Sequence, residues 1–321
     1  MSTSLIVREG TVGVTAPLPH IITSEGRKTT KRFLEFFTAN IRNKNTRLSY
    51  ARAVRQFLSW CETRGVTLTQ IEPMIVAAYI EQHEGSPTTV KQHLAAIRML
   101  FDWLVIGQAM PTNPASSVKS PRYSIKKGKT PVLSAEDARR LLDSIDTSHV
   151  VGLRDRAIIA VMIYSFARVS AVVQMKVKDY YPNGKRFWIR LHEKGGKYHE
   201  VPAHHTAEKY LDEYLKAAGI SGEMKKPLFR TTRGQSRALT ERALDRSRAW
   251  AMVKRRAKDA GVSLEIRCHT FRATGITEYL RNGGTIEKAA QIAAHESTRT
   301  TQLYNRVDDE LTLDEIERII I

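Results

Sequence analysis

The sequence has few cysteines and no long apolar run, and each shortage excludes a class of protein. Cys61 and Cys268 are the two cysteines among 321 residues, too few for a disulfide framework or a zinc site ligated by cysteines. No run of about 18 consecutive apolar residues occurs, so we expect no membrane partner. The N-terminus, MSTSLIVREG, lacks the basic start and long apolar core of a secretory signal. We therefore expect a protein of a reducing, cytoplasmic compartment.

Acidic residues are also in short supply relative to basic ones. The chain has 51 Lys and Arg against 33 Asp and Glu, which gives a formal net charge of +18 at pH 7. Such an excess is typical of proteins that bind nucleic acid. The cations are spread through both halves of the chain rather than collected in a terminal tail. The balance favours a nucleic-acid partner, and a basic but inert surface is the alternative.

The spacing of apolar residues predicts a helical first domain. Residues 1–24 show no regular pattern and are expected to be a flexible segment. Residues 25–118 show helical periodicity throughout, which indicates four or five short helices. Thr46 is expected to cap one of these helices, and Ser86-Pro87 to open another. The segment 119–131 is basic and contains proline, so it is predicted to be an extended linker.

The second domain, 132–321, is predicted to combine helices with a small sheet. Ser134 should cap its first helix. Residues 157–167 are apolar on every side, which indicates a buried helix that ends at Arg168. The segment RFWIRLHEKGGKYHEVPA alternates in polarity around a KGGK turn, as in a β-hairpin. Beyond the hairpin the pattern is mostly helical. The predicted fold class is therefore mainly α with a small β-sheet.

Six side chains suited to phosphoryl chemistry are spread over this second domain. They are Arg168, Lys194, His269, Arg272, His295 and Tyr304. Each alone is commonplace, because a lone His or Tyr is more often a packed core residue. Together they offer planar arginine forks for a phosphate, histidines that move protons and a tyrosine that can form a covalent intermediate. No paired carboxylates or His/Asp metal cluster accompany them, so side chains would have to meet the charge of the transition state.

The order and context of these residues resemble the tyrosine recombinases, also called the phage integrase family. The resemblance covers about residues 25–310. It rests on SFARVSAVVQM, EKGGKYHEVP, CHTFRATGITEYL and IAAHESTRTTQLY, in that order, behind an all-helical domain. It implies a helical, SAM-like core-binding domain at 25–118 and a mixed α/β catalytic domain of the DNA breaking-rejoining type at 132–321. The two would form a C-shaped clamp on duplex DNA.

The resemblance also implies a role for each of the six residues. Arg168 and Arg272 would clamp the non-bridging oxygens of the scissile phosphate. Tyr304 would attack phosphorus, which leaves a 3′-phosphotyrosine and a free 5′-hydroxyl, and Lys194 would protonate the departing 5′-oxygen. The two histidines would complete the site. His269 would take the proton of the attacking phenol.

His295 would hydrogen-bond the phosphate in the same scheme. The energy of the broken bond stays in the phosphotyrosine, so no cofactor and no metal are expected. Two positions depart from the family pattern. Ala171 stands where an acidic residue usually follows the first arginine by three positions, and Ala293-Ala294 stands where Leu-Gly usually precedes the fourth-motif histidine. The first change is expected to alter the support of the site.

Candidate DNA contacts are the cations of the linker and of the hairpin turn, which could lie along phosphates. They are Lys119, Arg122, Lys126, Lys127, Lys129 and Lys197. The tail 307–321 contains several Leu and Ile residues. In this family such a tail docks into a neighbouring subunit, so the resemblance implies a homo-tetramer on DNA with inverted half-sites. A tail folded onto its own domain is the alternative.

Two other functions fit part of the pattern. A type IB topoisomerase uses similar residues, but the helical first domain argues against it. A non-catalytic DNA-binding protein would fit the charge, but it would not need the histidine–tyrosine pair. Few residues precede the helical domain, so we expect a simple recombinase without an arm-binding domain. It would be associated with the nucleoid and would serve a mobile element, by integration and excision or by cointegrate or dimer resolution.

Overall fold

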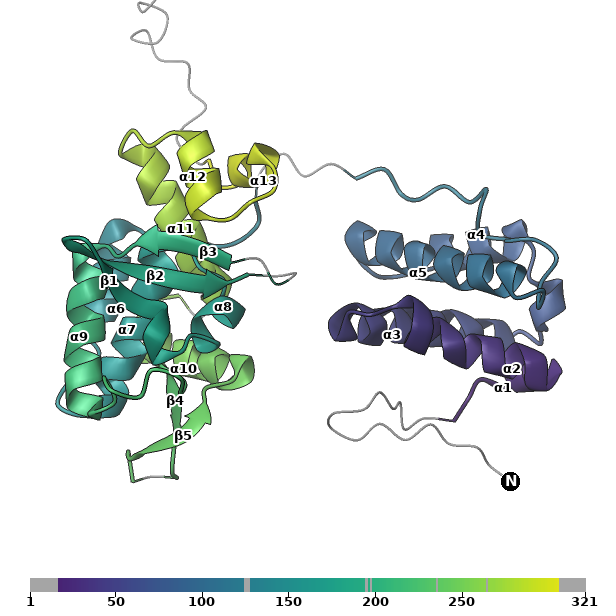
Figure 1. The fold of residues 1–321 in the computed structure, drawn as a ribbon. Coiled ribbons are helices and arrows are strands. Elements are labelled where there is room, and N and C mark those ends of the chain that lie inside the picture. The colour runs from purple at the N-terminus through teal and green to yellow at the C-terminus, as the bar shows by residue number, and fades with distance from the viewer. Residues whose placement is uncertain are drawn as a thin grey trace, which may run out of the picture. The chain divides into compact units, whose positions relative to one another are not determined.

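The chain divides between residues 124 and 125 into two compact units (Figure 1). Among the described residues, the first unit has one buried hydrophobic cluster and the second has two. The computed structural model describes residues 17–123, 128–193, 196, 198–234, 236–263 and 265–305. The tail 307–321 and four of the candidate lysines, Lys126, Lys127, Lys194 and Lys197, lie outside these ranges. Each unit is described by itself below.

The described part of the first unit is built from helices, as the periodicity predicts. They are α1 (His20–Thr23), α2 (Gly26–Glu35), a π-helical turn (Phe36–Asn40), α3 (Lys44–Glu62), a 3-10 turn (Leu68–Gln70), α4 (Pro73–Glu81) and α5 (Pro87–Ile106). The prediction that all are short is wrong, because α3 has 19 residues and α5 has 20. These two helices pack together and supply much of the buried core.

The two long helices, α3 and α5, begin at side-chain caps, and one of these caps was predicted in the wrong place. Ser86 accepts a hydrogen bond from the Thr89 amide and opens α5, as expected. The α3 helix begins before Thr46, because the side chain of Asn43 accepts from the amide of Thr46, at 3.1 Å, and from that of the residue before it. Within the predicted flexible segment 1–24, α1 contributes the buried Ile21 to the core, so ordered structure begins earlier than expected.

The second unit combines helices with two small antiparallel sheets. Its helices are α6 (Ala135–Asp143), α7 (Val150–Tyr164), α8 (Val169–Val173), a 3-10 turn (Val177–Asp179), α9 (His205–Ala218), α10 (Arg246–Asp259), α11 (Cys268–Arg281), α12 (Ile286–Ile292) and α13 (Thr298–Gln302). Its strands are β1 (Tyr180–Asn183), β2 (Arg186–His192), β3 (Tyr198–Pro202), β4 (Arg230–Thr232) and β5 (Leu239–Ala243).

The predicted hairpin is confirmed as β2 paired with β3. Ile189 lies opposite Val201 in the antiparallel register, and both are buried with Leu191 in the core of the unit. The hairpin gains a third strand, β1, on the free side of β2. Neither β1 nor the β4–β5 pair was predicted, since these strands have only three to five residues and show no alternation of buried and exposed positions.

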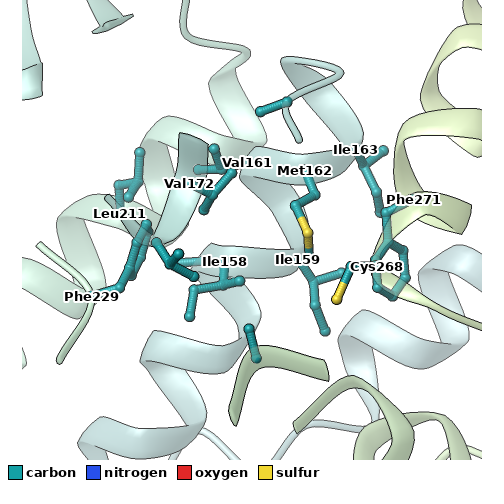
Figure 2. Packing of buried hydrophobic residues seen from close by; sticks show 14 of the residues in the cluster. Ile158, Ile159, Val161, Met162, Ile163, Val172, Leu211, Phe229, Cys268 and Phe271 are labelled. Carbon is teal, nitrogen blue, oxygen red and sulfur yellow. The ribbon is translucent and has the colours of Figure 1, made fainter. Parts of the chain in front are cut away.

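The α7 helix is the centre of the second unit. It packs against α9 and α11, and Figure 2 shows its apolar side chains between Leu211 and Phe229 on one side and Phe271 on the other. The expectation that this helix runs to Arg168 is wrong, because it ends at Tyr164. The next turn contains Phe166, whose φ of 53° is incompatible with a continuing right-handed helix.

This early end changes the position of Arg168. It is the N-cap residue of the short helix α8 rather than the last residue of a long buried one. Its backbone is extended, with φ of −72° and ψ of 142°. Ser134 caps α6 as predicted, accepting from the Asp137 amide at 2.9 Å. In the ranges that the structure describes, no helix is both long and apolar enough to cross a bilayer.

Gly275 on α11 allows α11 to approach α7 closely. Substitution of this glycine therefore tests the packing of the two helices. A Cβ atom at this position would lie 2.0 Å from the carbonyl oxygen of Ile163. We expect Gly275→Ala to destabilise the unit by roughly 1–3 kcal/mol, because two helix backbones must move apart. Urea unfolding followed by circular dichroism measures this.

Gly222 provides the matched control for that substitution. A Cβ atom there would meet nothing within 4 Å, and its φ is not positive. Gly222→Ala should therefore change the free energy of unfolding by no more than about 0.5 kcal/mol. Equal effects of the two substitutions would contradict the packing argument.

Candidate active site

Five of the six predicted catalytic residues lie in one region of the second unit. They come from the start of α8, from α11, and from the turns after α12 and α13: Arg168, His269, Arg272, His295 and Tyr304. The sixth, Lys194, is outside the described residues, although the hairpin that leads to it is described. The site is thus assembled from segments up to 136 positions apart in the chain.

Tyr304 and His269 are in direct contact in the site. The phenol oxygen of Tyr304 lies 2.7 Å from Nε2 of His269, which is hydrogen-bond distance. The ring of His295 lies nearly parallel to the tyrosine ring, with an interplanar angle of 9°. Tyr304 is only 7% exposed, and its carbonyl accepts from the Thr277 hydroxyl at 3.0 Å. The phenol therefore has both a fixed position and a proton acceptor.

Arg272 is the most deeply buried cation of the site. Its residue exposure is 1%. NH1 donates to the carbonyl of Phe166, and NH2 donates to the carbonyl of Ala293 at 2.6 Å. Its third donor, Nε, is buried and has no hydrogen-bond partner among the described residues. An unsatisfied buried donor is costly, so this group is poised to bond an acceptor that enters the site.

Both carbonyls that hold Arg272 belong to unusual turns of the backbone. Phe166 has a φ of 53°, and Ala294, which follows the second carbonyl, has a φ of 48°. The φ of Ala294 sets the plane of the peptide that carries the Ala293 carbonyl. The left-handed conformation costs an alanine about 1–2 kcal/mol. The departure from Leu-Gly noted in the sequence therefore leaves the turn intact but strained.

Arg168 is held by an acid that the sequence reasoning missed. Its NH1 donates to Oε2 of Glu193 at 2.5 Å, and the carboxylate side chain is only 5% exposed. The signal was present in the sequence, since Glu193 shares the inward parity of Ile189 and Leu191 on β2. A carboxylate at an inward position needs a cationic partner.

The histidines are kept neutral by burial and by the neighbouring arginines. Burial, with Arg272 and Arg168 nearby, lowers the pKa of His269 below its usual value. The same causes, with His269 in addition, lower the pKa of His295 to about 3. Both rings are therefore uncharged at neutral pH, and His269 can accept a proton. The Nδ1 atom of His295 lies 2.8 Å from the Thr301 hydroxyl, which fixes the ring.

The site concentrates positive charge in a buried region. Burial and the nearby Arg168 lower the pKa of Arg272 to about 10, and the Tyr304 oxygen and Glu193 offset part of this. The guanidinium still carries its charge at neutral pH. Two arginines share one neighbourhood against one carboxylate, Glu193. Such a site favours a ligand that brings negative charge and hydrogen-bond acceptors.

Three of the candidate DNA contacts are described, and all three are exposed: Lys119, Arg122 and Lys129. Beside Lys129, the amide of Gly128 donates to the carbonyl of Leu303 at 3.0 Å. The end of the predicted linker therefore lies against the segment that carries Tyr304. Ala171, at the position where the sequence lacks an acid, is fully buried in the hydrophobic core of the unit.

Comparison with known proteins finds two family models on this chain. The model described as the phage integrase family matches residues 131–310. The model described as the phage integrase, N-terminal SAM-like domain matches residues 31–107.

Individual proteins agree with these models. The tyrosine recombinase XerD of Listeria monocytogenes is 28% identical over 274 residues, which span 82% of this chain and 88% of that one. The structure of the XerH recombinase in a post-cleavage complex with a palindromic difH substrate has the same fold, with TM-score 0.70, 18% identity and coverage of 91% and 96%. A lambda integrase tetramer bound to a Holliday junction has TM-score 0.62 at 15% identity, with coverage of 86% and 80%.

The strained turn at Ala294 yields a prediction about stability. Ala294→Gly should raise the free energy of unfolding by about 0.5–1 kcal/mol, because glycine adopts the left-handed conformation without strain. The greater entropy of glycine in the unfolded chain offsets part of this stabilisation. Thermal melting measures the shift. Ala290→Gly, inside the neighbouring helix α12, is the control and should destabilise, since a helix interior disfavours glycine. A loss of stability in both variants would refute the strain.

Proposed function

We propose a catalytic scheme for this chain, which belongs to the phage integrase family. The protein is a site-specific tyrosine recombinase, a DNA breaking-and-rejoining enzyme. In the scheme Tyr304 is the nucleophile, and duplex DNA with inverted half-sites is the substrate. The observation that carries it is the 2.7 Å contact of the Tyr304 phenol with Nε2 of His269, beside Arg168 and Arg272.

Cleavage begins with attack of the Tyr304 oxygen on the scissile phosphorus. His269 is neutral, so it can take the phenolic proton as the new oxygen–phosphorus bond forms. The free Nε of Arg272 would donate to one non-bridging oxygen. Arg168, whose side chain is 35% exposed, would donate to another. His295 would hydrogen-bond the same phosphate.

The leaving group needs a proton to depart as a 5′-hydroxyl. We assign this proton to Lys194, because the hairpin strand β2 and the residue Glu193 lead directly into the site. The bond between phosphorus and the 5′-oxygen breaks as the phosphotyrosine forms. Attack by a 5′-hydroxyl of the partner strand reverses the step and returns the proton to Tyr304. The scheme conserves bond energy, so it needs neither ATP nor a metal.

The DNA would be held by cations on and near the linker, through phosphate contacts. They are Lys119, Arg122, Lys126, Lys127, Lys129 and Lys197. The lambda integrase structure is a tetramer on a Holliday junction. We infer the same assembly here, with the apolar tail 307–321 docked into a neighbouring subunit.

The family match covers both domains, which favours a recombinase over a type IB topoisomerase or a non-catalytic DNA-binding protein. For the biological role we propose a mobile element, acting by integration and excision or by cointegrate or dimer resolution at the nucleoid. Inverted half-sites of roughly 11–13 base pairs, about one helical turn each, should then lie in the DNA that flanks the gene. Their absence from the neighbouring DNA would count against this role.

Loss of the phenolic oxygen tests the nucleophile. Tyr304→Phe should bind a half-site with unchanged affinity and form no covalent adduct on a nicked substrate, because only the attacking atom is removed. A denaturing gel detects the adduct. Tyr210→Phe on α9 is the control. The Tyr210 ring packs under Arg156, which is not a residue of the site, so this variant should react like the wild type. Adduct from Tyr304→Phe would remove Tyr304 from this role.

Deletion of the tail tests the assembly. A protein lacking residues 311–321 should fill a single half-site as the full chain does, but fill paired half-sites with weaker cooperativity and recombine less. The reason is the loss of buried Leu and Ile side chains, each contributing about 1.5–3 kcal/mol when fully buried. Mobility-shift titrations on single and paired half-sites give the comparison. Unchanged cooperativity and recombination would place the subunit contact elsewhere.

A further inference from the structure

We propose that Glu193 is a positioning residue of this site, which holds the Arg168 guanidinium ready for the scissile phosphate. The proposal rests on the proposed function and names the support of one of its two clamps. Glu193 would not touch DNA itself. It would act through Arg168.

The geometry places a buried carboxylate directly on the guanidinium. Glu193 follows the last residue of β2, His192, on the inward side of the strand. Its Oε2 accepts from NH1 of Arg168 at 2.5 Å, and its side chain is almost fully buried. Burying a carboxylate is unfavourable unless a cation and hydrogen bonds compensate it. The pair is therefore a built feature of the site, unlike an exposed surface ion pair.

Nearby positions do not supply this carboxylate. Ala171, three positions after Arg168, is an apolar residue packed in the core. Asp179, the buried acid close by in the chain, is engaged elsewhere: its Oδ2 accepts from the Lys176 amide at 2.8 Å and lies 3.5 Å from Nε2 of His192. Among the described residues, the ion pair found for Arg168 is the one with Glu193.

The pair leaves the rest of the arginine fork for the substrate. The one hydrogen bond that the guanidinium of Arg168 makes within the described ranges uses NH1. Its remaining N–H groups can then face the phosphate in a fixed orientation. The negative charge of Glu193 also opposes the repulsion between Arg168 and Arg272. Because Glu193 directly follows β2, the same bond holds the described end of this strand beside Arg168.

Removing the charge while keeping the shape tests this role. Glu193→Gln should slow single-turnover formation of the covalent adduct on a nicked substrate by about tenfold or more, as for other residues that orient a site group. Half-site affinity should be unchanged or tighter, because a negative charge near DNA is removed. Glu193→Asp keeps the charge, so its rate of adduct formation should lie between those of Glu193→Gln and the wild type.

The hairpin itself offers a matched control. Glu200 on β3 accepts from Arg190 on β2 at 2.6 Å, so it forms a similar pair on the same two strands, but an exposed one. Glu200→Gln should leave the adduct rate within about twofold of the wild type, since exposed pairs contribute little. A loss equal to that of Glu193→Gln would mean that any break in the hairpin has this effect, which overturns the proposal.

A double-mutant cycle separates positioning from mere stability. Arg168→Lys keeps the charge but has no planar fork to orient. In that background Glu193→Gln should slow the adduct by less than about twofold more, because the two residues act as one unit. A full tenfold loss there, or a wild-type rate for Glu193→Gln alone, overturns the proposal. A wild-type protein that forms no adduct would instead refute the proposed function.

Discussion

The buried guanidinium of Arg272 is the interaction on which the second unit depends most. It donates to the carbonyl of Phe166, where the chain leaves α7, and to that of Ala293, where it leaves α12. One side chain on α11 therefore fixes two turns that are distant in sequence. Each turn is followed within two positions by a residue of the proposed site, Arg168 or His295. The helix that carries Arg272 is itself set against α7 by the absence of a side chain at Gly275. The packing of α11 against α7 and the geometry of the site therefore depend on the same helix.

The electrostatics of the site follow from the same burial. Desolvation and two neighbouring guanidinium groups keep His269 and His295 neutral, so the positive charge belongs to the arginines. A neutral imidazole beside the Tyr304 phenol can accept its proton, whereas an imidazolium could not. Positive charge and proton acceptance are thus assigned to different residue types. In the proposed scheme, the arginines carry the charge that binds the phosphate, and the histidines accept or share protons.

The parts of the site predictable from sequence were those encoded locally. Tyr304, His269 and Arg272 could be proposed because their residue types and spacing carry the chemistry, and the β2–β3 hairpin because its polarity alternates. The end of α7 could not be predicted, because the apolar run continues past Tyr164. The left-handed residue that follows, Phe166, has its carbonyl bonded to the guanidinium of Arg272, which is distant in sequence. Glu193 was overlooked for a related reason. Its meaning depends on Arg168, 25 positions earlier, and becomes visible when the pairing is known. The strands β4 and β5 have three and five residues, and neither shows an alternation of polarity that would predict a strand.

The segment that carries Tyr304 has little core of its own. Its helix α13 has five residues, and its backbone is held from outside, by the Gly128 amide at the Leu303 carbonyl and by the Thr277 hydroxyl at the next one. One of these two anchors, Gly128, lies near the start of the second unit, far from Tyr304 in sequence. The position of Tyr304 therefore depends on two neighbouring segments, so a substitution at Gly128 or Thr277 would shift it although neither residue belongs to its helix.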